Sequence, residues 1–261
     1  MGFKDQMALM AAPIFLRLAV AITFLWAGSG KMFQTIDVSG ADAAYLANMG
    51  ALDLTQLQAK PSAMMPQGDD RVLLPALAQT TPAAPTTSAR AFVASDFPTP
   101  IKARATYQLS LLLRNAADPG TDDKGVAKMK LWPPALAQGQ WTRWLAVTVM
   151  LTELVGGGLV LVGLFTRLWG FLLAGTMMGA MWLTLIGPAI QSGNTRLGFL
   201  PADMGPFDMG WMKWLWVFGL VMSCLALWCS GSGAWSLDSV MTPSKPSGGG
   251  RPAAAPPKPV Q

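Results

Sequence analysis

Two charged side chains, Arg17 and Glu153, lie inside long apolar runs of the sequence. Counted from the ends of these runs that we expect to be cytoplasmic, they lie about ten and about twelve residues deep, so at ~1.5 Å per helical residue their depths agree within a few ångströms. An ionised group inside a bilayer is costly unless it is paired. This placement predicts that the two side chains can meet as an intramembrane polar site.

The helical faces suit the same hypothesis. Arg17 shares a stripe with Lys31 at helical spacing, and Glu153 shares one with Gly156 and Gly157. Lys31 therefore joins the candidate site, although its place near a helix end also suits a side chain that reaches the membrane surface. Three readings stay open: a structural ion pair that fixes helix register, a proton-linked or small-molecule site, or two charges that never meet.

Small and aromatic residues suggest how such helices pack. Two pairs of glycines, Gly156 with Gly157 and Gly175 with Gly179, would let neighbouring helices approach closely, the second pair with the small-xxx-small spacing of membrane helices. Most tryptophans fall near the ends of apolar runs, where indole prefers the headgroup zone. Trp26 and Trp182 lie deeper and are candidates to line an apolar pocket for a flat ligand such as a quinone, with lipid-facing or packed tryptophan as the alternative.

The elements that must position these residues are membrane helices. The chain is 52% hydrophobic and only 13% charged, against about 25% charged in an average globular protein. Four apolar runs are long enough to cross a hydrocarbon core, which takes about 20 residues: residues 7–32, 144–165, 168–190 and 211–228. The sequence predicts an all-α membrane protein, a bundle of four transmembrane helices.

Composition excludes several kinds of site. The chain has no histidine and only two cysteines, Cys224 and Cys229, so it cannot build a disulfide framework, a cysteine-rich metal site or a histidine-ligated haem or zinc site alone. The basic residues behind the net charge of +5 are scattered rather than interleaved with aromatics in one patch, which argues against nucleic acid as a partner. The expected partner is the lipid bilayer, and no metal site is predicted.

Four regions follow from this pattern. Residues 1–33 hold the N-terminus and first transmembrane helix, and residues 144–238 hold the other three helices. Between them, residues 34–143 form a long, partly helical insert that contains a low-complexity linker at residues 78–88 and a segment of helical composition at residues 101–116. Residues 239–261 are rich in Pro, Gly and Ala and predict a disordered tail.

Loop charges predict the orientation. In a chain of four spans, both termini and the turn between the second and third helices share one side, and that side carries Lys4, Arg167, Lys245, Arg251 and Lys258. Because Lys and Arg are retained in the cytoplasm, we expect both termini to be cytoplasmic and the insert to be extracytoplasmic.

Several short motifs resemble those of the DoxX family of small four-helix membrane proteins. They comprise Leu16-Arg-Leu18, Ala27-Gly-Ser-Gly-Lys31, Thr152-Glu-Leu-Val-Gly-Gly-Gly-Leu159, Gly163-Leu-Phe-Thr-Arg167 and Gly231-Ser-Gly-Ala-Trp-Ser-Leu-Asp238. The resemblance covers a little over half the chain. It implies a four-helix bundle in the bacterial inner membrane and a place in membrane-associated redox chemistry, and by position it marks Arg17, Lys31, Glu153, Arg167 and Asp238.

Two functions from different classes follow. The first is an accessory subunit of a membrane oxidoreductase system that contacts quinone or a redox protein partner, with quinone as the candidate ligand. The second is a scaffold or transporter-like module in which the Arg17–Glu153 pair is structural and the insert recruits partners. A catalytic enzyme with its own cofactor ranks third, because the chain lacks a thiol pair suited to redox exchange.

Overall fold

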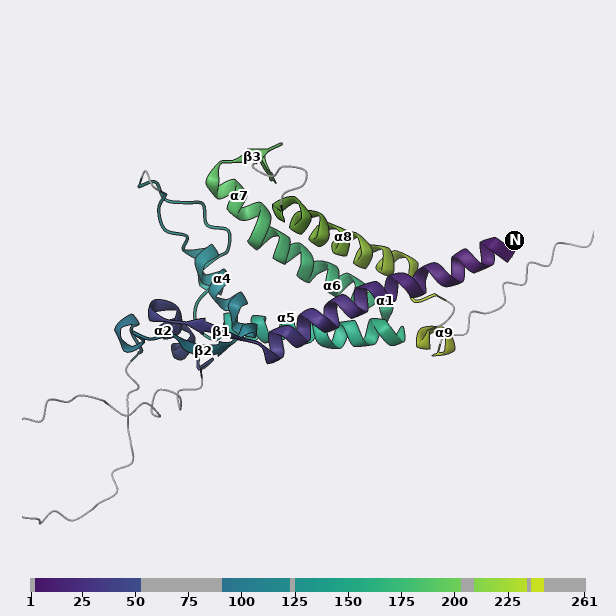
Figure 1. The fold of residues 1–261 in the computed structure, drawn as a ribbon, viewed down its shortest axis with the longest axis horizontal. Coiled ribbons are helices and arrows are strands. Elements are labelled where there is room, and N and C mark those ends of the chain that lie inside the picture. The colour runs from purple at the N-terminus through teal and green to yellow at the C-terminus, as the bar shows by residue number, and fades with distance from the viewer. Residues whose placement is uncertain (1–2, 53–90, 123–124, 203–208, 234–235, 242–261) are drawn as a thin grey trace, which may run out of the picture. The chain divides into compact units, whose positions relative to one another are not determined.

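The fold was examined in a computed structural model, which describes residues 3–52, 91–122, 125–202, 209–233 and 236–241 (Figure 1). Four of its helices are long and apolar enough to cross a membrane: Ala11–Phe33, Trp141–Val162, Thr166–Ser192 and Met209–Ser230. The predicted all-α membrane protein with four transmembrane helices is therefore confirmed. The chain divides into two compact units.

The first unit comprises residues 1–26, 152–181 and 204–261. It contains most of α1 (Phe3–Phe33), the second half of α5 (Trp141–Val162), α6 (Thr166–Met181), α8 (Met209–Ser230) and α9 (Leu237–Met241). Its core takes side chains from all four of the long helices α1, α5, α6 and α8. These core side chains are Val20, Ala21, Phe24, Val160, Leu173, Ala174, Cys224 and Leu227.

The second unit comprises residues 27–151 and 182–203. Apart from its spanning helices it contains β1 (Thr35–Val38), α2 (Gly40–Asn48), the short helix η1 (Ala94–Asp96), β2 (Ile101–Arg104), η2 (Ala105–Tyr107), α4 (Gln108–Ala117) and η3 (Pro134–Leu136). β1 and β2 pair antiparallel in a register that sets Thr35 opposite Arg104. α2, β1 and β2 contribute to one buried core, which includes Val38, Leu46, Phe97 and Ala103.

The insert therefore contains strands as well as the predicted helices. Residues 101–116 read as helical by composition, yet their first four residues form β2, where Ala103 is buried between two exposed neighbours. Pairing with β1 overrides the local preference, because an alternating segment can bury one face in a sheet. The predicted linker at residues 78–88 lies outside the described residues. The predicted tail begins within α9, which continues to Met241.

The third spanning helix changes its winding near one end. After α6, residues Trp182–Ile186 (η4) form a wider π-helical turn, followed by α7 (Gly187–Ser192). Pro188 explains this, because a proline lacks the N–H for an α-helical bond and its ring clashes with the carbonyl four residues earlier, here that of Thr184. A short antiparallel pair of strands, β3 (Thr195–Arg196) and β4 (Leu200–Pro201), follows α7.

Candidate functional site

The turn between α5 and α6 is the framework of the first candidate site. α5 ends at Val162, and Gly163 adopts a φ of 73°, a left-handed conformation that favours glycine. The amide of Gly163 donates to the carbonyl of Val160 (3.1 Å), and that of Leu164 donates to the carbonyl of Leu159 (2.9 Å). This pair of bonds is the Schellman ending of a helix. The sequence Gly163-Leu-Phe-Thr therefore closes α5 and starts α6 within one tight turn.

Arg17 of α1 caps the carboxyl end of α5. Its Nε donates to the carbonyl of Val160 (3.1 Å), and its Nη2 donates to that of Leu161 (2.8 Å). Its Nη1 donates to the carbonyl of Ser232, beyond the end of α8 (2.9 Å). A cation suits this place, because the last carbonyls of a helix carry partial negative charge. With only 6% of its surface exposed, Arg17 joins three elements of the bundle.

Asp238 of α9 caps the amino end of α6 on the other side of the same turn. The amides of Phe165 and Thr166 donate to its Oδ1 (2.8 Å) and Oδ2 (3.2 Å). The amide of Asp238 in turn donates to the carbonyl of Gly163 (3.1 Å). Its carboxylate also attracts the Arg17 guanidinium electrostatically. An anion at a helix amino end is stabilised by the helix dipole and by the free N–H groups there.

Gly163 is required at this turn for space as well as for its backbone angle. A Cβ at Gly163 would lie 2.6 Å from the Cβ of Ser236 and 2.7 Å from Cζ of Arg17. Ser236 donates through Oγ to the Oγ of Ser232 (2.8 Å), which closes the group. We call Arg17, Gly163, Ser232, Ser236 and Asp238 the capping cluster. The hydrogen bonds of this cluster join helices α1, α5, α6 and α9.

Glu153 is buried in α5, with 1% of its surface exposed. A Cβ at Gly157 would lie 3.1 Å from the backbone nitrogen of Leu25, so this part of α5 packs against α1. The contacts of Arg17 start at Val160, about two helical turns or roughly 10 Å along α5 from Glu153. Arg17 thus lies level with the end of α5. The Arg17–Glu153 ion pair stays a prediction.

The other predicted site residues are spread over both units. Lys31 is partly buried near the end of α1, and its carbonyl accepts a hydrogen bond from Thr106 Oγ1 (2.6 Å) in the second unit. Trp26 is 80% exposed, as suits contact with lipid. Trp182 in η4 is 38% exposed, and its Nε1 donates to the carbonyl of Leu131 (3.2 Å). Arg167 is exposed in the first turn of α6, and its role in topology stays a prediction.

The glycines differ in how closely they are packed. A Cβ at Gly156 would lie 2.8 Å from the ring of Trp169, whereas at Gly175 and Gly179 it would meet nothing within 4 Å among the described residues. Gly170 makes the close approach on α6 instead, because its Cβ would lie 2.9 Å from the carbonyl oxygen of Cys224 on α8. Sequence reasoning missed Gly170, although Ala174 four positions later gives it the small-xxx-small spacing of a membrane packing face.

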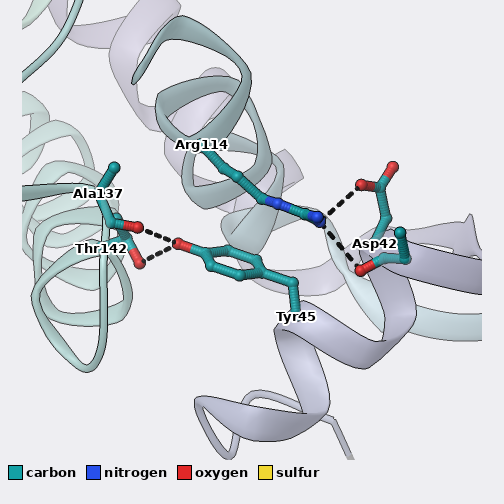
Figure 2. A network of polar contacts seen from close by, with 6 residues as sticks. Asp42, Tyr45, Arg114, Ala137 and Thr142 are labelled. Carbon is teal, nitrogen blue, oxygen red and sulfur yellow. Dashed lines mark hydrogen bonds and ion pairs between the residues drawn. The ribbon is translucent and has the colours of Figure 1, made fainter. Parts of the chain in front are cut away.

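A second polar network holds the insert to the start of α5 (Figure 2). The Tyr45 hydroxyl donates to the carbonyl of Ala137 (2.9 Å) and lies 2.8 Å from Oγ1 of Thr142. Arg114 lies over the ring of Tyr45, 5.0 Å from its centroid, and pairs with Asp42 at 3.2 Å. Since Tyr45 comes from α2, Arg114 from α4 and Thr142 from α5, the network joins three helices of the second unit. We call it the tyrosine network.

Comparison with known proteins places the chain in a family context. Among curated proteins and solved structures, none matches this chain. The model of the DoxX family matches residues 124–185, which include α5, α6 and the turn that carries the capping cluster. The resemblance predicted from the sequence is therefore confirmed for these residues, which include the motifs around Glu153 and Gly163, whereas the motifs around Arg17 and Asp238 lie outside the match.

Proposed function

We propose that this chain is an accessory subunit of a membrane-associated oxidoreductase system, in which it contacts quinone or a redox protein partner. The observation that carries the proposal is Glu153, a carboxyl group 1% exposed within an apolar spanning helix. Such a group is costly in a bilayer and by default points to a functional site. The resemblance to the DoxX family supplies the redox context, and the predicted orientation places both termini in the cytoplasm.

A carboxyl group suits a quinone head group chemically. In its protonated form Glu153 would donate a hydrogen bond to a quinone carbonyl, and in its ionised form it would accept a proton from the hydroquinone hydroxyl. The bundle also offers apolar surface for an isoprenoid tail, as the exposed side chains of Val155 and Leu161 on α5 illustrate. Electron transfer itself would take place on the partner enzyme.

The test is binding of a short-chain ubiquinone analogue to the full chain in nanodiscs, measured by titration calorimetry. We expect saturable binding that weakens at least tenfold in Glu153→Gln. Thr148→Gln is the matched control, because it places the same amide at an exposed position of the same helix. Absence of saturable binding by the native chain would refute the quinone proposal, and equal affinity in Glu153→Gln would refute the role of Glu153.

The alternative is a membrane scaffold or transporter-like module. Two observations favour it: the capping contacts of Arg17 suit a structural role, and the extramembrane part has its own buried core around Leu46 and Phe97. In this reading the insert recruits a partner through its exposed surface, which includes Lys102 and Arg104 on β2.

Affinity purification of the full chain from its native membrane separates the two functions. A scaffold would lose its redox partner when Lys102→Glu and Arg104→Glu are combined, and would keep it in Glu153→Gln. The quinone-linked subunit predicts loss of quinone binding in Glu153→Gln with the partner retained in both variants. Thermal unfolding of each variant checks that it is folded.

A further inference from the structure

The turn between β3 and β4 holds a leucine in a conformation that leucine disfavours. Leu197 has a φ of 56° and Gly198 one of 80°, and the amide of Phe199 donates to the carbonyl of Arg196 (3.4 Å). Two successive positive φ angles define a type I′ turn, whose favoured residues are Asn, Asp and Gly. Leucine costs free energy there, because its Cβ crowds the backbone in the left-handed region. The geometry of the turn alone does not explain why position 197 holds a leucine.

The same turn exposes its apolar side chains. Leu197 is 83% exposed and Phe199 is 47% exposed. Arg196, immediately before them, is exposed as well. The pairing of Arg196 with Leu200 holds these side chains on one short hairpin, and the amide of Ala202 closes its base by donating to the carbonyl of Asn194 (3.0 Å). A cation thus stands beside two apolar groups that the described residues leave uncovered.

The chain keeps this hairpin close to the membrane. The third spanning helix ends at Ser192, and the fourth begins at Met209. From Ser192 to Leu197 the chain can extend at most roughly 17 Å, at about 3.4 Å per residue. Each headgroup layer is about 5–8 Å thick, the difference between a ~30 Å core and a ~40–45 Å bilayer shared between two faces. The headgroup layer is therefore within reach of the tip.

We propose that the hairpin Thr195–Pro201 is an interfacial anchor that binds anionic phospholipid. Leu197 and Phe199 enter the boundary between headgroups and acyl chains, and the Arg196 guanidinium binds a lipid phosphate. The positive charge beside the apolar pair favours this partner, because guanidinium matches phosphate geometry and is attracted to an anionic headgroup. The inference is independent of quinone binding at Glu153.

The test measures the depth of a nitroxide label at position 197 in the full chain. Leu197→Cys is made in a Cys229→Ser background, where the remaining Cys224 is 0% exposed, and the protein is placed in nanodiscs of phosphatidylcholine and phosphatidylglycerol. The measured quantity is the ratio of relaxation by oxygen, which partitions into lipid, to relaxation by an aqueous nickel chelate. Val155→Cys on α5 is the lipid control and Lys102→Cys on β2 is the aqueous control.

We expect the ratio at position 197 to exceed that of Lys102→Cys several-fold and to approach that of Val155→Cys. A ratio equal to that of Lys102→Cys overturns the proposal. Shielding from both reagents also overturns it, because that result indicates a protein partner or a second copy of the chain on the hairpin.

The phosphate contact is tested separately. The ratio of relaxation by oxygen to relaxation by the nickel chelate at position 197 should fall when phosphatidylglycerol is replaced by phosphatidylcholine, because the label then lies less deep. Arg196→Glu should abolish that difference while Arg196→Lys retains most of it, and a difference that persists in Arg196→Glu overturns the role of Arg196. Thermal unfolding of both variants checks that the hairpin change has not disrupted the fold.

Discussion

Arg17 and Asp238 cap opposite sides of one turn: Arg17 donates to carbonyls at the end of α5, and Asp238 accepts from amides at the start of α6. Each charge complements the helix end that it meets, and the two attract each other. Because the short turn at Gly163 joins α5 to α6, the pair also ties α1 and α9 to this connection. The capping cluster therefore stabilises the short connection between α5 and α6 through a small set of directed contacts.

Arg17 should be the most sensitive position of the cluster. Arg17→Leu leaves the carbonyls of Val160, Leu161 and Ser232 without their charged donor, and hydrogen bonds to charged groups contribute about 1.5–3 kcal/mol each. We expect the free energy of unfolding in detergent to fall by roughly 3 kcal/mol. Arg17→Lys should lose less, because one ammonium can serve only part of the three acceptors. Equal stability of Arg17→Leu and the native chain would contradict the capping role.

Asp238→Asn tests the other cap. The amide oxygen of asparagine can still accept from one amide at the start of α6, but the charge that favours the helix amino end is removed. We expect a loss of about 1 kcal/mol in the free energy of unfolding, the usual size of an N-cap contribution. Asp37→Asn, at an exposed position of β1, removes the same charge as a control and should change stability little. The comparison uses denaturant titration of both variants in the same detergent.

Gly163→Ala separates steric crowding from backbone strain. The new Cβ would lie 2.7 Å from Cζ of Arg17, and the residue would also keep a φ of 73°. Gly193→Ala is a matched control, because Gly193 has a φ of 69° with nothing within 4 Å of the built Cβ among the described residues. The control should lose about 1 kcal/mol from the left-handed backbone alone. Gly163→Ala should lose clearly more, and similar thermal unfolding of the two variants would count against the cluster's tight packing.

The tyrosine network provides a fourth prediction. Tyr45→Phe removes the hydroxyl that contacts Ala137 and Thr142 but keeps the ring beneath Arg114. We expect a loss of about 1 kcal/mol and faster amide exchange around η3 and the start of α5. Thr142→Val, combined with Tyr45→Phe, completes a double-mutant cycle. Additive losses in the cycle would show that the two hydroxyls do not act together.

What sequence could predict here depended on how local the signal was. The four spanning helices follow from contiguous apolar length, and Gly163 and Asp238 fall within motifs that carried the family resemblance. The pairing of Arg17 with Glu153 rested on depth counted from the ends of apolar runs, and it stays a prediction. Such counting gave no sign that Arg17 donates to the last carbonyls of α5, because helix depth does not show which backbone groups a side chain meets.

The contacts of the insert could not be predicted from the sequence for a different reason. Tyr45 meets Ala137 and Thr142 across separations of 92 and 97 residues, and β1 pairs with a strand that follows a long intervening segment. No local pattern marks these partners, because each depends on how distant segments pack. The helical composition of residues 101–116 likewise gave no sign that Ile101–Arg104 would pair with β1.

Gly170 is the position at which α6 and α8 approach closely, and it gives the last prediction. In Gly170→Ala the new Cβ would lie 2.9 Å from the carbonyl oxygen of Cys224 and 3.1 Å from the amide nitrogen of Trp228, both backbone atoms that cannot move alone. The helices would have to separate, which weakens the contact of Leu173 with its core neighbours on α8. Overpacking of this kind costs about 1–3 kcal/mol, more than the helix propensity gained.

Gly175→Ala is the control for Gly170→Ala, because it lies on the same helix and a Cβ there would meet no described atom within 4 Å. Alanine should leave its stability unchanged or raise it by up to about 1 kcal/mol through helix propensity. The measurement compares the thermal unfolding of both variants in the same detergent. Destabilisation by Gly175→Ala, with Gly170→Ala unaffected, would instead favour the small-xxx-small face of α6 as its packing surface.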